Sequence, residues 1–450
     1  MSVDTVSMTG WGRTAPTTAL RFRPRTHEEA VAAVRGCGPR GVVARGLGRA
    51  HGDAAQNAGG SVVDMTALDR IRTFDADTGT VVCDAGVSLH RLMTVLLPLG
   101  WFVPVTPRTR HVTVGGAIGA DVHGSNHPAA GSFTRHVRAL ELLTADGEVR
   151  TVLPGTDLFD ATAGGLGLTG VVLSATLRFR RVATSLMTVD TERAADLDEA
   201  LARLASSGHS APYATAWIDL LARGKARGRA VLTRGEHAPL DALPARARRT
   251  PLVFRPKQLS ATPPALVPEG LLGRTSAALF SELRYRSAPV SRSGELQKLS
   301  AFFHPMDAVP HWNRLYGRSG FVHYQFAVGY GQEETLHRIV GRISARRCPA
   351  FHAVLGRFGE AGPGWLSFPA PGWTLSFGLP AGLPGLARFL DGLDDEVAAA
   401  GGRVCLAKDA RLRPEALATM YPRLPEFRTL RAELDPGGAF RSDLSRRLAL

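Results

Sequence analysis

Residues 44–57 read ARGLGRAHGDAAQN and directly follow the apolar GVV at 41–43. Glycines permit positive φ angles and let several backbone N–H groups converge on one anion. Two more glycine-rich segments occur in the same part of the chain, TVGGAIGADVHGSN at 113–126 and GGLGLTG at 164–170. None of the three has the spacing of the dinucleotide fingerprint or of the nucleotide-triphosphate loop. Together they predict a long cofactor that lies across several strand ends.

The first 185 residues predict short strands interleaved with helices. Helices are expected at 26–37 and 88–100, with Thr26 and Ser88 as their N-cap residues. The pair Asp146-Gly147 favours a tight turn between two strands within 137–152. A mixture of this kind, without strict strand–helix–strand repeats, predicts an α+β fold. Further strands are expected at 61–66, 80–86 and 170–179.

The pattern changes near residue 186. Residues 235–290 are rich in Pro and Arg and carry few periodic apolar residues, so we expect a mobile loop there, of the kind that often forms a lid or binding surface. Around this loop, helices are expected at 197–208 and 334–347, and strands at 213–221, 321–330 and 373–380.

We therefore predict two domains. The first comprises residues 1–185 together with a C-terminal segment, 404–450, that returns to it. The second, residues 186–403, is inserted between them as a mixed α/β domain built on an antiparallel sheet.

The chain is strongly basic, with 54 Lys and Arg against 40 Asp and Glu and a net charge of +14. The arginines are spread out, with no basic helix and no interleaved aromatic residues, which argues against nucleic-acid binding. Such a surface suits an anionic lipid headgroup or a phosphorylated substrate. The four lysines are candidates for places that require a primary amine, and Lys408 follows a short apolar run. They are Lys225, Lys257, Lys298 and Lys408.

Cysteine spacing and hydropathy limit the class of protein. The four cysteines have neither metal-ligand nor disulfide-framework spacing, so we expect no metal and a reducing compartment. No apolar run approaches the roughly 20 residues that span a bilayer, and the first residues lack a signal-peptide pattern. The expectation is a cytoplasmic protein.

Several long motifs carry a family resemblance. Besides the three glycine-rich segments they are GWGRTAP at 10–16, HVRALELLTADGEVR at 136–150, the segment 302–326, LSFPAPGW at 366–373 and AKDAR at 407–411. These motifs resemble the FAD-binding superfamily of vanillyl-alcohol oxidase, with its PCMH-type fold. Within it they are most similar to the decaprenylphosphoryl-β-D-ribose 2'-oxidases of mycobacterial arabinan precursor synthesis. The likeness runs nearly end to end.

The resemblance implies which residues hold the cofactor. The glycine loop and nearby polar residues would bind the pyrophosphate, the second glycine segment would line the flavin, and the third would lie beside the adenine. Small residues suit these places, because a planar ring and a dianionic linker need close backbone approach. The implied FAD-binding residues are Gly46, Leu47, Gly48, Arg49, Ala50, His51, Asn57, Thr109, Gly115, Gly116, Gly119, Ala120, Val122, His123, Gly170, Val171 and Lys408.

The resemblance also implies a catalytic set and a substrate-binding set. In this class a secondary alcohol gives a hydride to the flavin while its hydroxyl proton leaves to a base or solvent. The catalytic set is Lys408, Gln325, Tyr316 and His123, and the substrate-binding set is Trp217, Tyr316, His323, Gln325, Arg357 and Ser376. The alternatives are a solvated surface lysine at 408, locally satisfied strand residues at 316 and 325, and a core histidine at 123.

This chain departs from the family pattern on the substrate side. Ser376, Thr374, His323, Arg357 and Ser125 stand where the family has Cys, Asn, Gln, Lys and Lys. The loss of two amines and an amide puts the decaprenyl-phosphate substrate in question, although Arg357 can still bind a phosphate through its forked guanidinium.

His51 replaces the family tyrosine. In the sister alditol and aldonolactone oxidases a histidine at this place bonds covalently to the flavin 8α-methyl group, for which a neutral imidazole is required. His51 is therefore a candidate for an 8α-histidyl link to FAD. The alternative is a histidine that only packs against the flavin edge.

The leading hypothesis is a flavoenzyme that oxidises a ribofuranosyl hydroxyl, at C2, to a ketone as the first half of an epimerisation. The expected substrate is decaprenylphosphoryl-β-D-ribose or a related ribosyl phosphate, and the expected partner is a nicotinamide-dependent short-chain reductase. The alternative enzyme is an alditol- or aldonolactone-type oxidase that uses O2. The alternative from another class is a basic lipid- or nucleic-acid-binding protein with a vestigial flavin. A weak contact with the inner face of the plasma membrane is expected from the charge.

Overall fold

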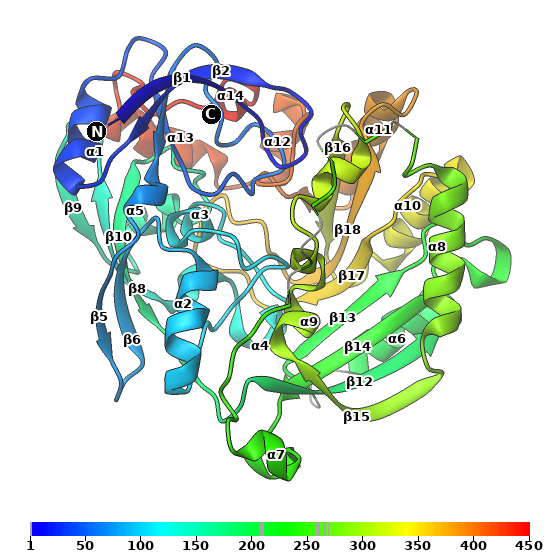
Figure 1. Ribbon diagram of the computed structural model, residues 1–450. Helices are drawn as coiled ribbons and strands as arrows, with labels where there is room; N and C mark the ends of the chain where they lie inside the picture. Colours follow the sequence, from blue (N-terminus) through cyan, green and yellow to red (C-terminus); the bar gives the residue numbers. More distant parts are fainter. Residues whose placement is uncertain (1, 207–210, 258, 260–261, 265–266, 269) are drawn as a thin grey trace.

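The computed structural model describes residues 2–206, 211–257, 259, 262–264, 267–268 and 270–450. Helices and antiparallel sheets mix along the chain, which confirms the α+β prediction. Figure 1 shows two lobes, with both chain ends in the lobe that holds the first strands.

A four-stranded sheet opens the fold. Its first pair is antiparallel and its remaining pairs are parallel. Helix α1 (His27–Arg35) begins where the Thr26 hydroxyl accepts from the Glu29 N–H, as the capping signal predicted. In spatial order the strands are β1 (Ser2–Met8), β2 (Thr17–Arg23), β4 (Ser61–Asp64) and β3 (Val42–Arg45).

A five-stranded antiparallel sheet lies beside it. The predicted hairpin forms, with Gly147 at φ +81° and the Asp146 carboxylate accepting from the Thr144 hydroxyl. Buried residues of both sheets, such as Val63 and Leu173, share one apolar core. Its strands, in spatial order, are β5 (Ile71–Asp75), β6 (Thr80–Asp84), β10 (Val171–Arg178), β8 (Val137–Leu143) and β9 (Val149–Val152).

Short helices complete this lobe. Ser88 caps the second predicted helix by accepting from the Arg91 N–H. Strands β7 (Trp101–Phe102) and β11 (Arg180–Arg181) form a separate pair. The helices are α2 (Leu89–Leu96), α3 (Val114–Gly119), α4 (His127–Ala130) and α5 (Asp157–Thr162).

The second lobe is an eight-stranded, wholly antiparallel sheet. One face packs against helices α6 (Leu197–Ser206), α10 (Glu333–Arg346) and α11 (Leu386–Ala399) in a single apolar core. The opposite face looks toward the first lobe (Figure 1). In spatial order the strands are β15 (Ser291–Lys298), β12 (Leu186–Ala194), β14 (Ala230–His237), β13 (Tyr213–Ile218), β17 (Ala353–Phe358), β18 (Gly372–Pro380), β16 (Phe321–Val328) and β19 (Arg403–Val404).

The C-terminal segment returns to the first lobe. Phe440 bridges to Val42, and the Asp443 carboxylate accepts from the Ala58 N–H. The predicted limits of the two domains stay a prediction. Helices of this segment are α12 (Pro414–Met420), α13 (Leu424–Leu434) and α14 (Asp443–Arg447).

The expected mobile loop at 235–290 is wrong over part of its length. Helix α8 (Arg274–Ser287) occupies its last third, and a short helix, α7 (Ala245–Arg248), occurs earlier. Helix α8 is held by polar contacts: Arg229 pairs with Glu282 and lies over the Tyr285 ring at 4.5 Å. The positions of this segment at 258, 260–261, 265–266 and 269 lie outside the described residues.

Candidate functional site

Three distant chain segments stack at the boundary between the lobes. The Gly12 N–H donates to the His51 carbonyl at 2.9 Å, and the His51 N–H donates to the Ala407 carbonyl at 3.0 Å. A Cβ added to Gly52 would lie 1.7 Å from the Asp409 carbonyl oxygen. Only glycine allows this approach, which fixes the segment that carries Lys408 against the glycine loop.

The glycine loop presents free backbone donors. No backbone N–H of residues 47–50 donates to another part of the described chain. Gly48 has φ +64°, and a Cβ on Gly46 would lie 2.1 Å from the Thr113 hydroxyl oxygen. The Arg49 guanidinium stacks on the Trp11 ring at 3.8 Å. Successive unpaired donors in a glycine turn form an anion-binding cradle.

Lys408 lies among protein atoms without a described carboxylate partner. Burial lowers the pKa of its ammonium to about 8; the Cys405 thiol opposes this shift, whereas the nearby Arg108 guanidinium adds to it. The lysine can therefore hold or release its proton near neutral pH.

The sheet face opposite the helices carries a row of cross-strand neighbours. Trp217 of β13 pairs with Val354 of β17, Val354 pairs with Ser376 of β18, and Ser376 pairs with Gln325 of β16. Side chains in such a register share one face. Three of the predicted substrate-binding residues, Trp217, Ser376 and Gln325, are thus brought together.

Gln325 joins the two lobes. Its amide nitrogen lies 3.0 Å from His123 Nε2 and 3.1 Å from the Thr374 hydroxyl oxygen. Because the Thr374 hydroxyl donates to the Phe326 carbonyl, it accepts from the amide, which assigns the nitrogen of Gln325 to this side. The buried Gln325 Oε1 has no partner in the described chain and remains free to accept from a ligand.

His323 and His51 form a second polar pair. His323 Nε2 lies 2.7 Å from the Ser376 hydroxyl oxygen, and its ring centroid is 4.4 Å from that of His51. Burial, and then the positive charge of Lys408, hold the pKa of both imidazoles well below the usual value. Both rings are therefore neutral at pH 7.

Tyr316 is buried beside the same strands. Its ring stacks on Phe321 with centroids 4.6 Å apart, and burial raises the pKa of its hydroxyl. The Tyr316 hydroxyl oxygen lies close to Gly378, because a Cβ added to Gly378 would be 3.2 Å from it. Gly378 is two residues beyond Ser376 on the same strand. His123 packs edge-on to Phe358 at 4.9 Å, and burial holds its pKa well below the usual value.

The structure does not bring Arg357 to this face. Arg357 pairs with Trp373 and lies on the helix-covered side, where Nη1 donates to the Leu204 and Ala205 carbonyls at 2.7 and 2.5 Å. The prediction that Arg357 belongs to the substrate-binding set and binds its phosphate is therefore wrong.

Other predicted cofactor residues have partners within the protein. Asn57 donates to the Gly41 and Ser61 carbonyls and accepts from Arg446, so it braces the loop. The Thr109 hydroxyl donates to Asp307 at 2.8 Å. Val171 is fully buried in the core between the first two sheets, behind Gly170.

The second glycine segment forms a compact turn of helix. Thr113 caps α3 by accepting from the Gly116 N–H, while Gly115 donates to the Ala85 carbonyl. Near its end, Ala120 donates to the Gly116 carbonyl and Val122 to the Ala117 carbonyl. Gly119 packs close to the third glycine segment, since a Cβ added to Gly119 would lie 3.7 Å from the Gly167 backbone nitrogen.

Three basic residues were not predicted from the sequence: Arg108 and His352, which lie near Lys408, and Arg284, which lies near Arg108. Arginine is so abundant in this chain that its presence at 108 and 284 does not distinguish these positions. The only sequence signal was the position of Arg108, just before the second glycine segment.

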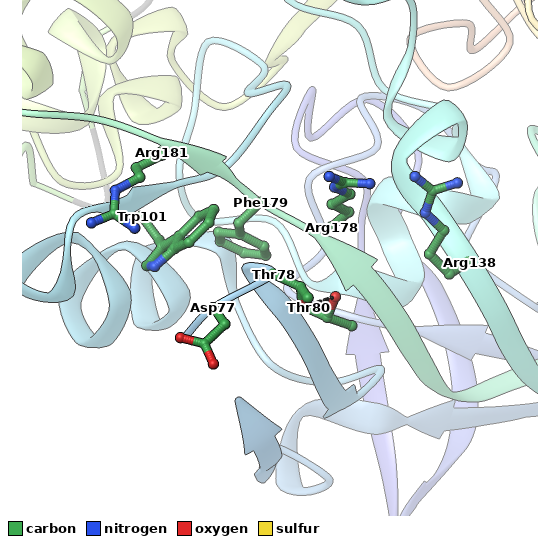
Figure 2. A pocket seen from close by; sticks show the side chains of 8 residues that line it. All are labelled: Asp77, Thr78, Thr80, Trp101, Arg138, Arg178, Phe179 and Arg181. Carbon is green, nitrogen blue, oxygen red and sulfur yellow. Dashed lines mark hydrogen bonds between the residues drawn. The ribbon is translucent and has the colours of Figure 1, made fainter. Parts of the chain in front are cut away.

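A separate surface pocket of about 560 Å³ lies on the second sheet (Figure 2). It contains Trp101 and the guanidiniums of Arg138, Arg178 and Arg181, together with Asp77. No predicted site residue lines it.

Comparison with known proteins identifies related sequences. Residues 18–153 match the family model of an FAD binding domain, and residues 381–448 match that of D-arabinono-1,4-lactone oxidase. The first match confirms the expected PCMH-type fold.

Three relatives illustrate the range of similarity. Decaprenylphosphoryl-β-D-ribose oxidase of Mycolicibacterium smegmatis is 44% identical over an alignment of 454 positions, which covers 99% of this chain and 98% of that protein. An uncharacterised Streptomyces coelicolor protein is 54% identical over 372 residues, 81% of this chain and 100% of its own length. Alditol oxidase of a Streptomyces species is 29% identical over 216 residues, 47% of this chain and 51% of that enzyme.

Proposed function

Because this chain belongs to the decaprenylphosphoryl-β-D-ribose oxidase family of FAD-dependent oxidoreductases, we propose that it oxidises the C2 hydroxyl of a ribofuranosyl phosphate to a ketone. Decaprenylphosphoryl-β-D-ribose, or a related ribosyl phosphate, is the proposed substrate. The observation that carries the proposal is the convergence of Lys408, Gln325 and His123 between the lobes, in a chain that aligns with that oxidase over 99% of its length.

The free polar atoms of the site fit FAD. The unpaired N–H groups of residues 47–50 would hold the pyrophosphate, as backbone donors do in other anion cradles. The unpartnered Gln325 Oε1 would accept from an N–H of the cofactor or from the sugar hydroxyl. Small residues in α3 allow close approach of a planar ring.

When bound, FAD supplies the acceptor for the hydride that leaves the sugar carbon. Lys408 places a positive charge where negative charge develops. With a pKa of about 8 it carries its proton at pH 7. The neutral imidazole of His323 would accept the proton that leaves the substrate hydroxyl, whereas His123 already accepts from the Gln325 amide through Nε2. Tyr316 and Ser376 would orient the sugar.

The alternative function is an alditol- or aldonolactone-type oxidase that passes electrons to O2 from a covalently bound FAD. Two observations favour it: the match of residues 381–448 to D-arabinono-1,4-lactone oxidase, and a neutral imidazole at His51. We propose the covalent 8α link at His51 under either function, because its nitrogen must be unprotonated to attack.

The wider setting is also part of the proposal. A keto sugar must be reduced again to complete an epimerisation, so a nicotinamide-dependent short-chain reductase is the proposed partner, and a cell-wall arabinan precursor is the proposed product. No described helix is long and apolar enough to cross a membrane. A peripheral contact with the inner face of the plasma membrane is supported by the net charge of +14 and by Leu279 and Leu283, each 60% exposed on α8.

The test is reduction of bound flavin. The purified FAD-loaded protein is mixed without O2 with β-D-ribofuranosyl phosphate carrying a short or a long prenyl chain, and the flavin absorbance is followed. Bleaching with either ribosyl donor, and recovery of the 2-keto sugar, are expected. Bleaching by xylitol or an aldonolactone, but by no ribosyl phosphate, would favour the alternative.

A further inference from the structure

Two arginines and a histidine lie close together near Lys408, and the described chain supplies no carboxylate to them. Arg108 comes from the loop before α3, Arg284 from α8 and His352 from the residue before β17. Neither arginine forms an ion pair with a described residue. Both side chains are solvent-exposed, and the protein atoms packed around each lower its pKa, that of Arg108 to about 10.

Both arginines are anchored on the sheet face that carries Ser376 and Gln325. Arg108 Nη2 donates to the Thr215 hydroxyl at 2.7 Å, and the Arg284 guanidinium lies over the Trp217 ring at 5.2 Å from its centroid. Thr215 and Trp217 are two residues apart in β13, so both point to the same face. The arginines therefore stand at one end of the cross-strand row that begins at Trp217.

Two buried polar nitrogens at the same place have no partner in the described chain. Trp217 is 5% exposed, and its indole N–H meets no acceptor in the described chain. His352 Nε2 is likewise buried without a partner. Burial lowers the pKa of His352 to about 3, and the nearby Arg108 and Arg284 guanidiniums add to this shift, so the ring is neutral. Two unpartnered polar atoms beside two arginines without a carboxylate partner provide the groups that an anion would bind.

We propose that Arg108 and Arg284, with the Trp217 indole N–H and His352, bind the phosphoryl group of the substrate. The proposal rests on the proposed function, since it assigns the anionic end of the same substrate. It replaces the expected role of Arg357, which lies on the other face of the sheet. Arginine suits this task because its fork binds two phosphate oxygens at once.

The spacing along the row fits a sugar phosphate. Three strand steps separate Trp217 from Gln325, which is about 14 Å between backbones. We place the ribose ring and its phosphate along this row, with C2 toward Gln325 and the phosphate toward Arg108.

The test measures anion binding apart from oxidation. The FAD-loaded protein is titrated calorimetrically with inorganic pyrophosphate, and flavin reduction by β-D-ribofuranosyl phosphate is measured in parallel. Arg108→Gln and Arg284→Gln are each expected to weaken pyrophosphate binding at least tenfold and to raise KM for the ribosyl phosphate by a similar factor. The matched control is Arg286→Gln, on the same helix, whose side chain pairs with Glu282.

The outcomes separate the two proposals. Failure of the wild type to bind pyrophosphate, or equal binding by Arg108→Gln, Arg284→Gln and the control, would overturn the anion site. Normal anion binding without bleaching by any ribosyl phosphate would instead overturn the proposed function. A ribosyl phosphate with a prenyl chain and one without it should lose affinity equally in both variants. A wild-type preference for the prenylated form identifies a lipid headgroup, and equal affinity identifies a water-soluble phosphate.

Discussion

The amide nitrogen of Gln325 lies 3.0 Å from His123 Nε2, and this contact joins the eight-stranded sheet to the lobe with the glycine segments. The amide donates, so His123 accepts at Nε2 and carries its proton on Nδ1. One side chain thereby sets a histidine tautomer, keeps a free carbonyl oxygen in the site and connects the two halves of the molecule.

Replacing Gln325 with Met tests this contact. The change leaves the buried His123 Nε2 and Thr374 hydroxyl without a donor, which should cost about 1–3 kcal/mol of unfolding free energy. The rate constant of flavin reduction should fall about tenfold or more, because an orienting contact is lost. Urea unfolding and stopped-flow reduction measure the two effects. Gln297→Met, on β15, is the control, and equal rates in the two variants would exclude a role for Gln325.

The covalent link at His51 is decided by acid precipitation. We expect the yellow colour to remain with the precipitated wild-type protein, and to move to the supernatant in His51→Tyr, which lacks the attacking nitrogen. His337→Tyr, on the surface of α10, should behave as the wild type does. Colour in the wild-type supernatant would mean that His51 only packs against the cofactor.

Lys408→Met should stabilise the flavin-free protein at pH 7. The pKa of Lys408 is lowered from 10.5 to about 8, so its charged form is disfavoured in the folded state by about 3 kcal/mol. The folded pKa is the lower one, so the unfolded chain holds more protons between pH 8 and 10.5, and wild-type stability rises with pH in that window.

The gain from Lys408→Met should therefore be largest below pH 8 and shrink as the pH approaches 10.5. Thermal unfolding of both proteins at a series of pH values measures it. The same variant should lose flavin reduction by ribosyl phosphate. A constant difference in stability from pH 7 to 10 would contradict the assigned pKa.

Most of the secondary structure was predictable from local signals. Thr26 and Ser88 cap helices where expected, and Asp146-Gly147 forms the turn of a hairpin. These caps and this turn depend on a few neighbouring residues, so a short stretch of sequence is enough to predict them.

Sheet faces and polar helices were harder to predict. Arg357 lies two and four residues after the buried Leu355 and Ala353, so the alternation of side chains along the strand predicts that it points to the helix-covered face. Helix α8 was missed because its contacts to Arg229 and the β12 strand are polar and distant in sequence. The pair Arg108 and Arg284 could not be singled out from the sequence, because the chain has 54 Lys and Arg residues.

Gly52→Ala should prevent the C-terminal segment from docking. The new Cβ would lie 1.7 Å from the Asp409 carbonyl oxygen and 2.9 Å from the Ala410 Cα, and neither backbone atom can move without shifting Lys408. We expect loss of bound flavin and a cost of several kcal/mol. Flavin content after purification and thermal unfolding measure both. Gly38→Ala is the matched control, because its Cβ would meet nothing within 4 Å. Full flavin content in Gly52→Ala would contradict this packing.

Asp307→Asn tests the buried brace behind the glycine segments. Asp307 accepts from the Thr109 hydroxyl and the Arg110 N–H, each at 2.8 Å, and pairs with Arg110 Nη1 at 3.5 Å. Arg110 is fully buried, so removal of the negative charge leaves its guanidinium uncompensated, which should cost about 3–5 kcal/mol.

Asp198→Asn is the control for Asp307→Asn, since Asp198 is 82% exposed and pairs with His337 at the surface. We expect a change below about 0.5 kcal/mol there. Urea unfolding of both variants gives the comparison. Flavin affinity should fall only in Asp307→Asn, because the loop that holds Thr109 loses its anchor to the second lobe. A cost below about 1 kcal/mol for Asp307→Asn would show that Arg110 finds another anion, and that the brace between the lobes does not depend on this carboxylate.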